Sequence, residues 1–283
     1  MSFKAMTFTS RPSMQSWLLA LTVAAAFPSA VLSPSQGLQE LWPSASLLTR
    51  GSYTCNHDYS IEILSTDPLV LYINGFIQDF EIRHLLRTHS HRFEASRVVQ
   101  KDLQSEVNPD QRRSDSATIP LEDPVSQCLI DRIKLLLGNL QHEEVDALQL
   151  LRYDTGGQFR LHYDWFPFVA NKRNISETGV DRDFQRLATT FVYLSDDCVG
   201  GETYFPHILG VSPTADGEKF SRTDTGEGLL VKPKKGNAIF WNNMHMNGTG
   251  DTRVLHAGMP LQSGEKLGLN IFSTYFLDSP LIG

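Results

Sequence analysis

The chain is poor in cysteine, and the spacing of its cysteines excludes the zinc sites that cysteine pairs build. Its 283 residues contain three cysteines, Cys55, Cys128 and Cys198, and no CxxC pair. Two interpretations of them stay open at this point: one disulfide with a free third thiol, or three buried thiols.

A surplus of basic residues is also missing. Lysine and arginine together number 25 against 32 aspartates and glutamates, which gives a formal net charge of −7. Proteins that bind nucleic acid depend on lysine and arginine to displace counterions from the phosphates. We therefore expect no nucleic-acid partner.

A long apolar run is missing as well, although the N-terminus carries a short one. The run Trp17–Phe27 follows Lys4 and Arg11 and precedes small residues and prolines. It falls short of the roughly 20 apolar residues of a comfortable membrane span, and is typical of a signal peptide. We predict a signal peptide or an uncleaved signal anchor over residues 1–33, the alternative being a buried helix of the mature domain. Either targeting interpretation predicts the secretory pathway, with the protein in the endoplasmic reticulum lumen or anchored in its membrane facing the lumen.

Two glycosylation triplets agree with that route. They are Asn174-Ile-Ser176 and Asn247-Gly-Thr249, so Asn174 and Asn247 are the predicted acceptors. Such triplets also arise often by chance, so each alone is a weak signal.

The sequence shows no internal repeat and divides into three parts. Residues 34–66 are rich in serine, proline and leucine and are predicted to be a tether. The folded domain is expected over residues 67–283, beginning with a short strand at 68–73. Two helices should follow, one capped by Asp79 and one with Asp123 as its cap and Gly138 at its end.

The polar segment between these helices, residues 100–118, has two open interpretations. It is either a solvated surface loop or a loop that contacts substrate.

From Val145 onward, short runs of β-branched and aromatic residues alternate with turn residues. This pattern is typical of a sandwich or barrel, and helices followed by strands indicate the α+β class. The expected strands are 146–153, 158–164, 188–194, 201–205, 228–232, 237–241, 253–257 and 266–276.

The strongest chemical signal is the sequence His162-Tyr-Asp164 in one of these strands. Alternate side chains of a strand point the same way, so His162 and Asp164 would present an imidazole and a carboxylate together. Two histidines and one carboxylate on one face suit iron(II) and leave coordination positions open. The third ligand would be His245, in a turn, or His256, within a strand.

Lys266 opens the last expected strand. A lysine facing into a barrel would need a charged partner, which a dicarboxylate ligand would supply. The alternative is a surface lysine at the start of a strand.

Taken together, these segments resemble the prolyl 4-hydroxylase family of iron(II)/2-oxoglutarate dioxygenases, from about Pro68 to Phe276. The matching segments are Arg112-Arg-Ser-Asp-Ser116, Leu150-Leu-Arg-Tyr-Asp-Thr-Gly-Gly-Gln-Phe159, His162-Tyr-Asp164, Tyr193-Leu-Ser195, Gly200-Gly-Glu-Thr-Tyr-Phe-Pro206, Gly236-Asn-Ala-Ile-Phe-Trp241, Leu255-His-Ala-Gly-Met-Pro260 and Gly264-Glu-Lys266.

The resemblance implies a double-stranded β-helix (jelly-roll) core over residues 145–276 with flanking N-terminal helices. It also implies that His162, Asp164 and His256 bind the metal and that His245 does not. Lys266 and Tyr153 would hold the far carboxylate of 2-oxoglutarate, and no catalytic residue beyond the metal ligands is implied. The cofactors would be Fe²⁺, 2-oxoglutarate, dioxygen and ascorbate.

The leading substrate implied by the resemblance is a peptidyl proline, oxidised by hydroxylation, with desaturation left open. The segment between Asp164 and Leu187 is longer and more polar than in peptidyl-proline enzymes, which keeps a small molecule of a biosynthetic pathway as an alternative substrate. A non-catalytic jelly-roll binding protein is a third possibility. The intact set of His162, Asp164, His256 and Lys266 argues against it. The sequence leaves the oligomeric state open.

Overall fold

The computed structural model describes residues 53–99, 105–138, 144–167, 172–175, 180–208, 212 and 214–277. The predicted targeting segment, residues 1–33, lies outside this described part, as does the predicted tether up to residue 52. No helix in the described ranges is long and apolar enough to cross a membrane.

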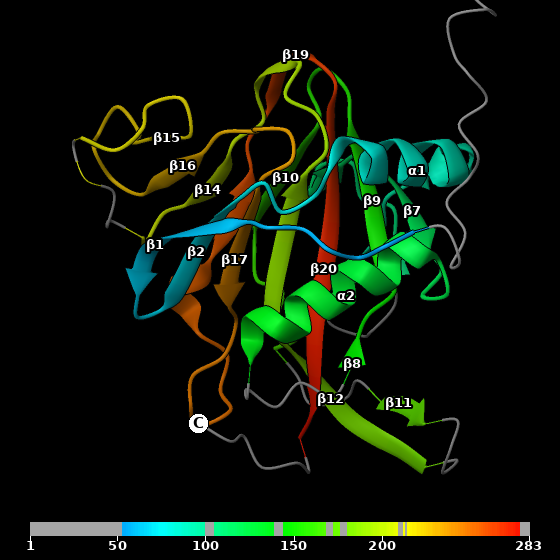
Figure 1. Ribbon diagram of the computed structural model, residues 1–283. Coiled ribbons are helices and arrows are strands. Elements are labelled where there is room, and N and C mark those ends of the chain that lie inside the picture. Colours follow the sequence, from blue (N-terminus) through cyan, green and yellow to red (C-terminus); the bar gives the residue numbers. More distant parts are fainter. Residues whose placement is uncertain are drawn as a thin grey trace, which may run out of the picture. The chain divides into compact units, whose positions relative to one another are not determined.

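A large antiparallel sheet forms the body of the domain (Figure 1). Its strands, in spatial order, are β1 (Ser60–Thr66), β2 (Leu69–Asn74), β17 (Ala238–Asn242), β12 (Val180–Tyr193), β20 (Lys266–Phe276), β9 (Leu148–Tyr153), β7 (Asp115–Ile119) and β3 (Glu94–Ala95). Two further strands join its sides: β11 (Lys172–Ile175) pairs with β12, and β8 (Glu144–Val145) pairs with β20.

A second, smaller antiparallel sheet faces the large one. It consists of β15 (Phe220–Ser221), β16 (Leu229–Val231), β14 (Thr203–Phe205), β18 (His256–Gly258), β10 (Gln158–His162) and β6 (Arg112–Arg113). Two short pairs complete the strands: β13 (Cys198–Gly200) with β19 (Leu261–Gly264), and β4 (Val98–Val99) with β5 (Ser105–Glu106).

The alternation of side chains along the strands of the large sheet creates two cores. On β12, Phe191 and Tyr193 join the cluster between the sheets, together with Phe205 and Val231 of the small sheet. Val192, which points the other way, joins a second cluster. That second cluster lies under the helices.

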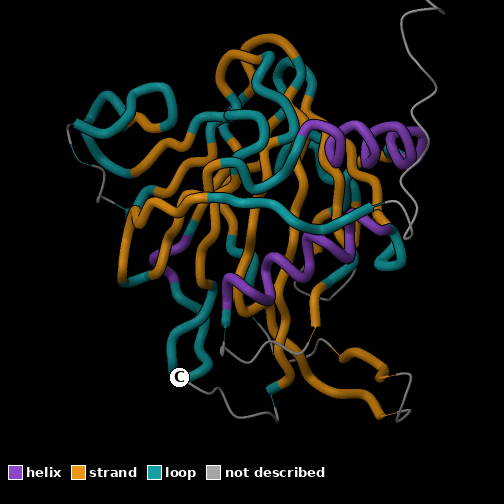
Figure 2. Tube along the Cα trace, in the orientation of Figure 1, coloured by secondary structure: helices purple, strands orange, loops and turns teal. Residues whose placement is uncertain are grey.

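The helices α1 (Asp79–His89) and α2 (Pro124–Leu137) cover the outer face of the large sheet, where Figure 2 shows them on one side of the strands. Ile82 and Leu129 are among the helix residues that pack on it. Asp123 is the N-cap of α2 and accepts from the backbone N–H groups of Val125 and Ser126, as predicted. The predicted cap of α1 is wrong by one residue, because the helix begins at Asp79 and Gln78 is its N-cap.

The predicted boundary between tether and domain, at residue 66, lies too far along the chain, because residues before it already belong to the fold. Residues 60–66 form β1, which pairs with β2 along its length. Tyr53 donates a hydrogen bond to Glu81 of α1, and Cys55 forms a disulfide with Cys128 of α2. The domain therefore includes at least residues 53–66.

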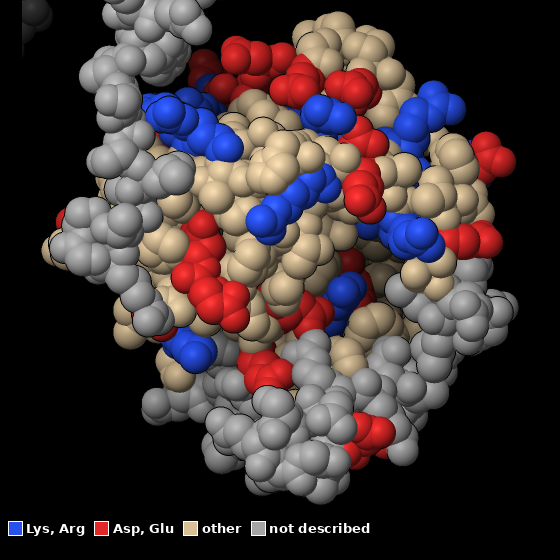
Figure 3. Space-filling view, turned by 90° about the vertical axis from the view of Figure 1, so that its right-hand side faces the viewer, with Lys and Arg blue, Asp and Glu red and all other residues tan. Residues whose placement is uncertain are grey.

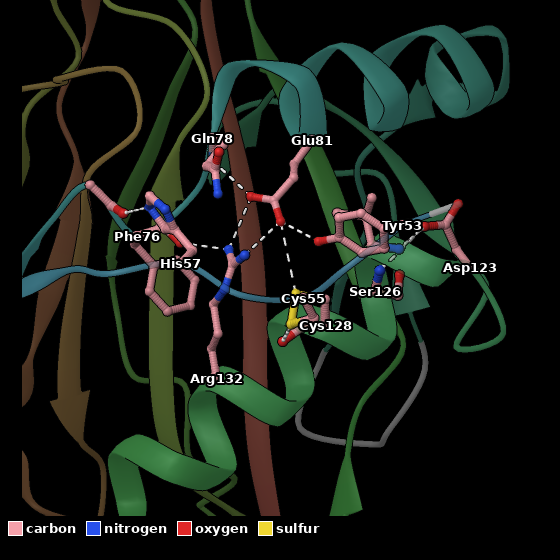
Figure 4. Close-up of polar contacts among 12 residues, drawn as sticks. Tyr53, Cys55, His57, Phe76, Gln78, Glu81, Asp123, Ser126, Cys128 and Arg132 are labelled. Atoms are coloured by element: carbon pink, nitrogen blue, oxygen red, sulfur yellow. Dashed lines mark hydrogen bonds and ion pairs between the residues drawn. A yellow bond between two sulfur atoms is a disulfide. The ribbon is translucent and has the colours of Figure 1, made fainter. Parts of the chain in front are cut away.

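Around this disulfide, Glu81 and Arg132 make a buried ion pair between the two helices (Figure 4). Arg132 Nη2 lies 2.6 Å from Glu81 Oε1, and neither residue is more than 4% exposed. The pair and the disulfide link α1, α2 and the segment before β1. Of the two open interpretations of the cysteines, the structure has the disulfide, with Cys198 as the free thiol.

The polar segment 100–118 is only partly a surface loop. Its last residues, from Asp115 on, form β7 within the large sheet, and Arg112 in β6 is only 7% exposed. The expected strand 253–257 also differs, because Thr252–Val254 is a 3-10 helix and β18 begins at His256.

The two facing sheets with helices on one outer face confirm the predicted double-stranded β-helix. Figure 3 shows one side of the molecule, on which the coloured basic and acidic side chains are interspersed. The described residues on that side therefore form no continuous basic surface.

Candidate metal centre

The pairing of β10 with β18 places His162 opposite His256. The centroids of the two imidazole rings are 4.2 Å apart. Asp164 follows two residues after His162 and lies beside both: its carboxylate oxygens are 3.6 Å from His162 Nε2 and 3.5 Å from His256 Nε2. One donor atom from each of the three residues lies within 4.8 Å of the others.

Each histidine has its other ring nitrogen bonded to the backbone. His162 Nδ1 is 2.7 Å from the carbonyl of Arg160, and His256 Nδ1 is 2.9 Å from the carbonyl of Val254. A carbonyl oxygen can only accept, so each Nδ1 carries the proton and each Nε2 presents a lone pair toward Asp164. This is the tautomer that a metal-binding histidine needs.

The protonation states agree with that tautomer. Burial, together with the neighbouring His256, lowers the pKa of His162 to about 3, so its imidazole is neutral at ordinary pH. Burial would raise the pKa of Asp164, but the two histidines, Arg186 and Thr189 lower it below its usual value. The neutral imidazole of His162 beside the ionised carboxylate of Asp164 suits a divalent cation such as iron(II).

Aromatic rings hold both imidazoles in place. Phe159 stacks on His162 with 3.5 Å between ring centroids and 17° between ring planes. Trp241 packs edge-on against His256 at 4.7 Å. The ligand geometry is therefore set by packing as well as by hydrogen bonds.

These three residues line a cavity of about 530 Å³, and Lys266 and Tyr153 line the same cavity. Lys266 pairs with Tyr153 in the register of β20 and β9. It is 2% exposed and donates to the backbone carbonyl of Gly201 at 2.6 Å. In the described part of the chain no carboxylate forms an ion pair with it, and burial lowers its pKa to about 8.

Among the described residues, Lys266 is thus a buried cation with no carboxylate at ion-pair distance, although the charge of Glu202 acts on it from further away. It lies in the same cavity as three possible ligands for a cation. A buried charge without a partner is costly. The aromatic rings of Tyr153, Phe191 and Tyr193 lie 4.9 to 5.7 Å from its Nζ and supply only part of the missing stabilisation. The arrangement fits a ligand that carries a carboxylate.

His245, the competing third histidine, lies elsewhere. It is in the turn after β17, its side chain is 40% exposed, and its Nδ1 is 3.6 Å from Asp251. The structure brings His256, and not His245, to His162 and Asp164.

Arg112 and Arg186 are among the residues that line the cavity, and no role is predicted for either from the sequence. Arg112 lies over the Phe159 ring at 4.8 Å, and its buried Nη2 has no hydrogen-bond partner among the described residues. Arg186 pairs with Asp146 at 3.2 Å and lies 3.6 Å over the Phe272 ring. The segment around Arg112 was among those that resemble the family, whereas Arg186 carries no signal of its own in the sequence.

The comparisons with known proteins agree with this geometry. The family model described as the 2OG-Fe(II) oxygenase superfamily matches residues 148–274. Probable prolyl 4-hydroxylase 6 of Arabidopsis thaliana is 32% identical over 230 residues, which cover 79% of this chain and 76% of that protein. The chain belongs to the prolyl 4-hydroxylase-like 2-oxoglutarate- and iron(II)-dependent oxygenases.

A second relative supports the same assignment, and a solved structure supports the fold. Prolyl 4-hydroxylase 2 of Arabidopsis thaliana is 31% identical over 218 residues, covering 73% of this chain and 67% of that protein. The viral collagen prolyl hydroxylase of Paramecium Bursaria Chlorella virus-1, solved with 2-oxoglutarate, superposes with a TM-score of 0.51 at 24% identity, over 72% of this chain and 95% of that one. This last likeness supports the fold. The chain is a 2-oxoglutarate-dependent dioxygenase rather than a non-catalytic binding protein.

We predict that His162→Ala removes the metal site, because it deletes one of three convergent donors, whereas His245→Ala leaves the site intact. The measurement is the stoichiometry of bound Mn²⁺ on the purified variants. Retention of metal by His162→Ala, or its loss in His245→Ala, would contradict the arrangement described above.

Proposed function

We propose that this oxygenase hydroxylates prolyl residues in peptides. The observation that carries the proposal is a single cavity lined by a His–Asp–His set at one place and, at another, by a buried lysine that forms no ion pair with any described residue. The relatives named as prolyl 4-hydroxylases support proline as the target.

In this proposal His162, Asp164 and His256 would hold the iron, and Lys266 with Tyr153 would hold the far carboxylate of 2-oxoglutarate. The bound groups would supply the activation of dioxygen, with one oxygen atom going into a substrate C–H bond and the other into succinate as carbon dioxide is released. Ascorbate would serve as an added reductant.

The walls of the cavity suit a proline-rich segment. Tyr163, Trp165, Phe166 and Phe272 are among the residues that line it. Aromatic-lined surfaces recognise proline-rich peptides well, because such peptides are already extended and lose little entropy on binding. The same rings exclude water from the reacting C–H bond.

The test is hydroxylation of proline-rich peptides by the purified chain with iron(II), 2-oxoglutarate and ascorbate. We expect a mass gain of one oxygen on proline, matched by succinate, and neither with Lys266→Ala. Succinate formed with a metabolite extract but with no peptide would favour the alternative, a small-molecule substrate.

The affinity for 2-oxoglutarate should fall as the pH rises above 8. Burial places the pKa of Lys266 at about 8, so the lysine loses its proton above that pH in the unliganded protein. A dicarboxylate needs the charged form, so the dissociation constant should rise by up to about tenfold per pH unit.

Calorimetric titration of 2-oxoglutarate on both sides of pH 8 measures this dependence. Lys266→Arg is the control, because arginine keeps its charge throughout this range. A dissociation constant that does not change with pH in the wild type would contradict the assigned role of Lys266.

We also propose that the protein works in the secretory pathway, in the endoplasmic reticulum lumen or anchored to its membrane. The Cys55–Cys128 disulfide supports an oxidising compartment. Asn247 lies exposed in a turn, where its Oδ1 accepts from Thr249. Asn174 belongs to β11, but its side chain lies outside the described part.

Expression of the full chain in eukaryotic cells tests the compartment. We expect an endoglycosidase-sensitive protein whose gel mobility changes further when Asn247→Gln removes the exposed acceptor. A chain without glycan and with reduced Cys55 and Cys128 would place it in a different compartment.

A further inference from the structure

Behind the candidate metal centre, Asp164 receives a hydrogen bond from within the large sheet. Thr189 Oγ1 lies 2.7 Å from Asp164 Oδ2. Thr189 is fully buried in β12, where it pairs with Trp241 of β17 on one side and Phe272 of β20 on the other. Its hydroxyl group is therefore held in place by a strand in the middle of the sheet.

A second buried side chain stands behind Thr189. Asn243 follows β17, is fully buried, and places its Nδ2 2.9 Å from Thr189 Oγ1. Its backbone is fixed on both sides: its N–H donates to the carbonyl of Leu187 at 2.8 Å, and its carbonyl accepts from Asp251 at 2.9 Å. The Oδ1 of Asn243 is buried, and no described residue makes a hydrogen bond with it.

The chemistry of these groups gives the chain of hydrogen bonds one direction. The ionised carboxylate of Asp164 can only accept, and the amide nitrogen of Asn243 can only donate. The threonine hydroxyl has a single proton, so it accepts from Asn243 and donates to Asp164. With the amide turned over, the hydroxyl would face two acceptors and the NH₂ group of Asn243 would lose its acceptor.

Burying the side-chain amide of Asn243 has a cost in folding free energy. Leaving the buried Oδ1 of Asn243 unsatisfied opposes folding, and an apolar side chain of similar size would avoid that cost. The benefit of an amide at this position is the hydrogen bond that it donates to Thr189. Outer hydrogen-bond partners of metal-binding carboxylates and histidines tune metal affinity in this way.

We propose that Thr189 and Asn243 are positioning residues of the metal centre, acting through Asp164. Thr189 fixes the rotation of the Asp164 carboxylate toward the two histidines, and Asn243 fixes the direction of the Thr189 hydroxyl. The inference rests on the proposed metal role of His162, Asp164 and His256, and it adds two residues that do not touch metal or substrate.

The variants that test it remove the hydrogen bonds while keeping the volume of the side chains. Thr189→Val should weaken Mn²⁺ binding by about tenfold or more, and Thr189→Ser, which restores the hydroxyl, should recover most of it. Asn243→Leu should weaken binding by a smaller factor. It should leave the thermal unfolding midpoint of the metal-free protein unchanged or raised, because the unsatisfied Oδ1 is removed.

A matched control lies next to Thr189 on the same strand. Thr190 is 1% exposed and points to the opposite face, in register with Phe240 and Ile271 of the core under the helices. Thr190→Val makes the same chemical change without touching Asp164, and its Mn²⁺ affinity should match that of the wild type.

The double variant Thr189→Val/Asn243→Leu distinguishes a relay from two independent effects. Once the hydroxyl is gone, Asn243 has no path to Asp164, so the double variant should bind Mn²⁺ as Thr189→Val does. Additive losses would overturn the proposal. Unchanged affinity in Thr189→Val, or an equal loss in Thr190→Val, would do the same while leaving the metal site standing. A wild-type chain that binds no metal would overturn the proposed function as well.

Discussion

The antiparallel pairing of β10 with β18 is the contact on which the rest of the active centre depends. It sets His162 against His256 from distant parts of the chain, with Asp164 two residues beyond. Because side chains alternate along a strand, a shift of one residue would turn His256 out of the space between the sheets. Neighbouring strands hold this register, since β6 pairs with β10 and β14 pairs with β18.

The space between the sheets contains two places of opposite electrostatic preference, one for a cation and one for an anion. At the His–Asp–His set, lone pairs and a carboxylate favour a cation. At Lys266, a buried positive charge that no described carboxylate pairs with favours an anion. A molecule with a carboxylate at each end, one of them next to a keto group, can bind at both places. Its two ends bind a metal differently, so only one orientation places the keto-acid end at the His–Asp–His set and the other carboxylate at Lys266.

Much of this arrangement follows from the sequence, because it depends on local periodicity. The alternation along β9, β12 and β20 and the capping of α2 by Asp123 are local features, and so is the shared direction of His162 and Asp164. The choice between His245 and His256 is different, because it depends on which strands pair. The local pattern leaves both histidines open, and the family resemblance implies His256.

The features that the sequence prediction lacks are mostly tertiary. The exception is β1, which lies in the predicted tether although Ser60-Ile-Glu-Ile-Leu-Ser-Thr66 alternates as strands do; its pairing with β2 is what joins it to the domain. Arg112 lies in a polar segment and is buried only because β6 pairs with β10. Asn243 directly follows β17, and its hydrogen bond to Thr189 joins segments that no local pattern connects.

The buried charge of Lys266 also makes the stability of the folded protein depend on the concentration of a metabolite. A ligand that binds only the folded state stabilises it in proportion to the logarithm of its concentration. Because 2-oxoglutarate would supply a carboxylate to the buried Lys266, its binding would stabilise the folded domain in this way. In a cell, scarcity of that cosubstrate would slow turnover and also increase the fraction of molecules open to proteolysis, so the amount of enzyme would follow the metabolic state.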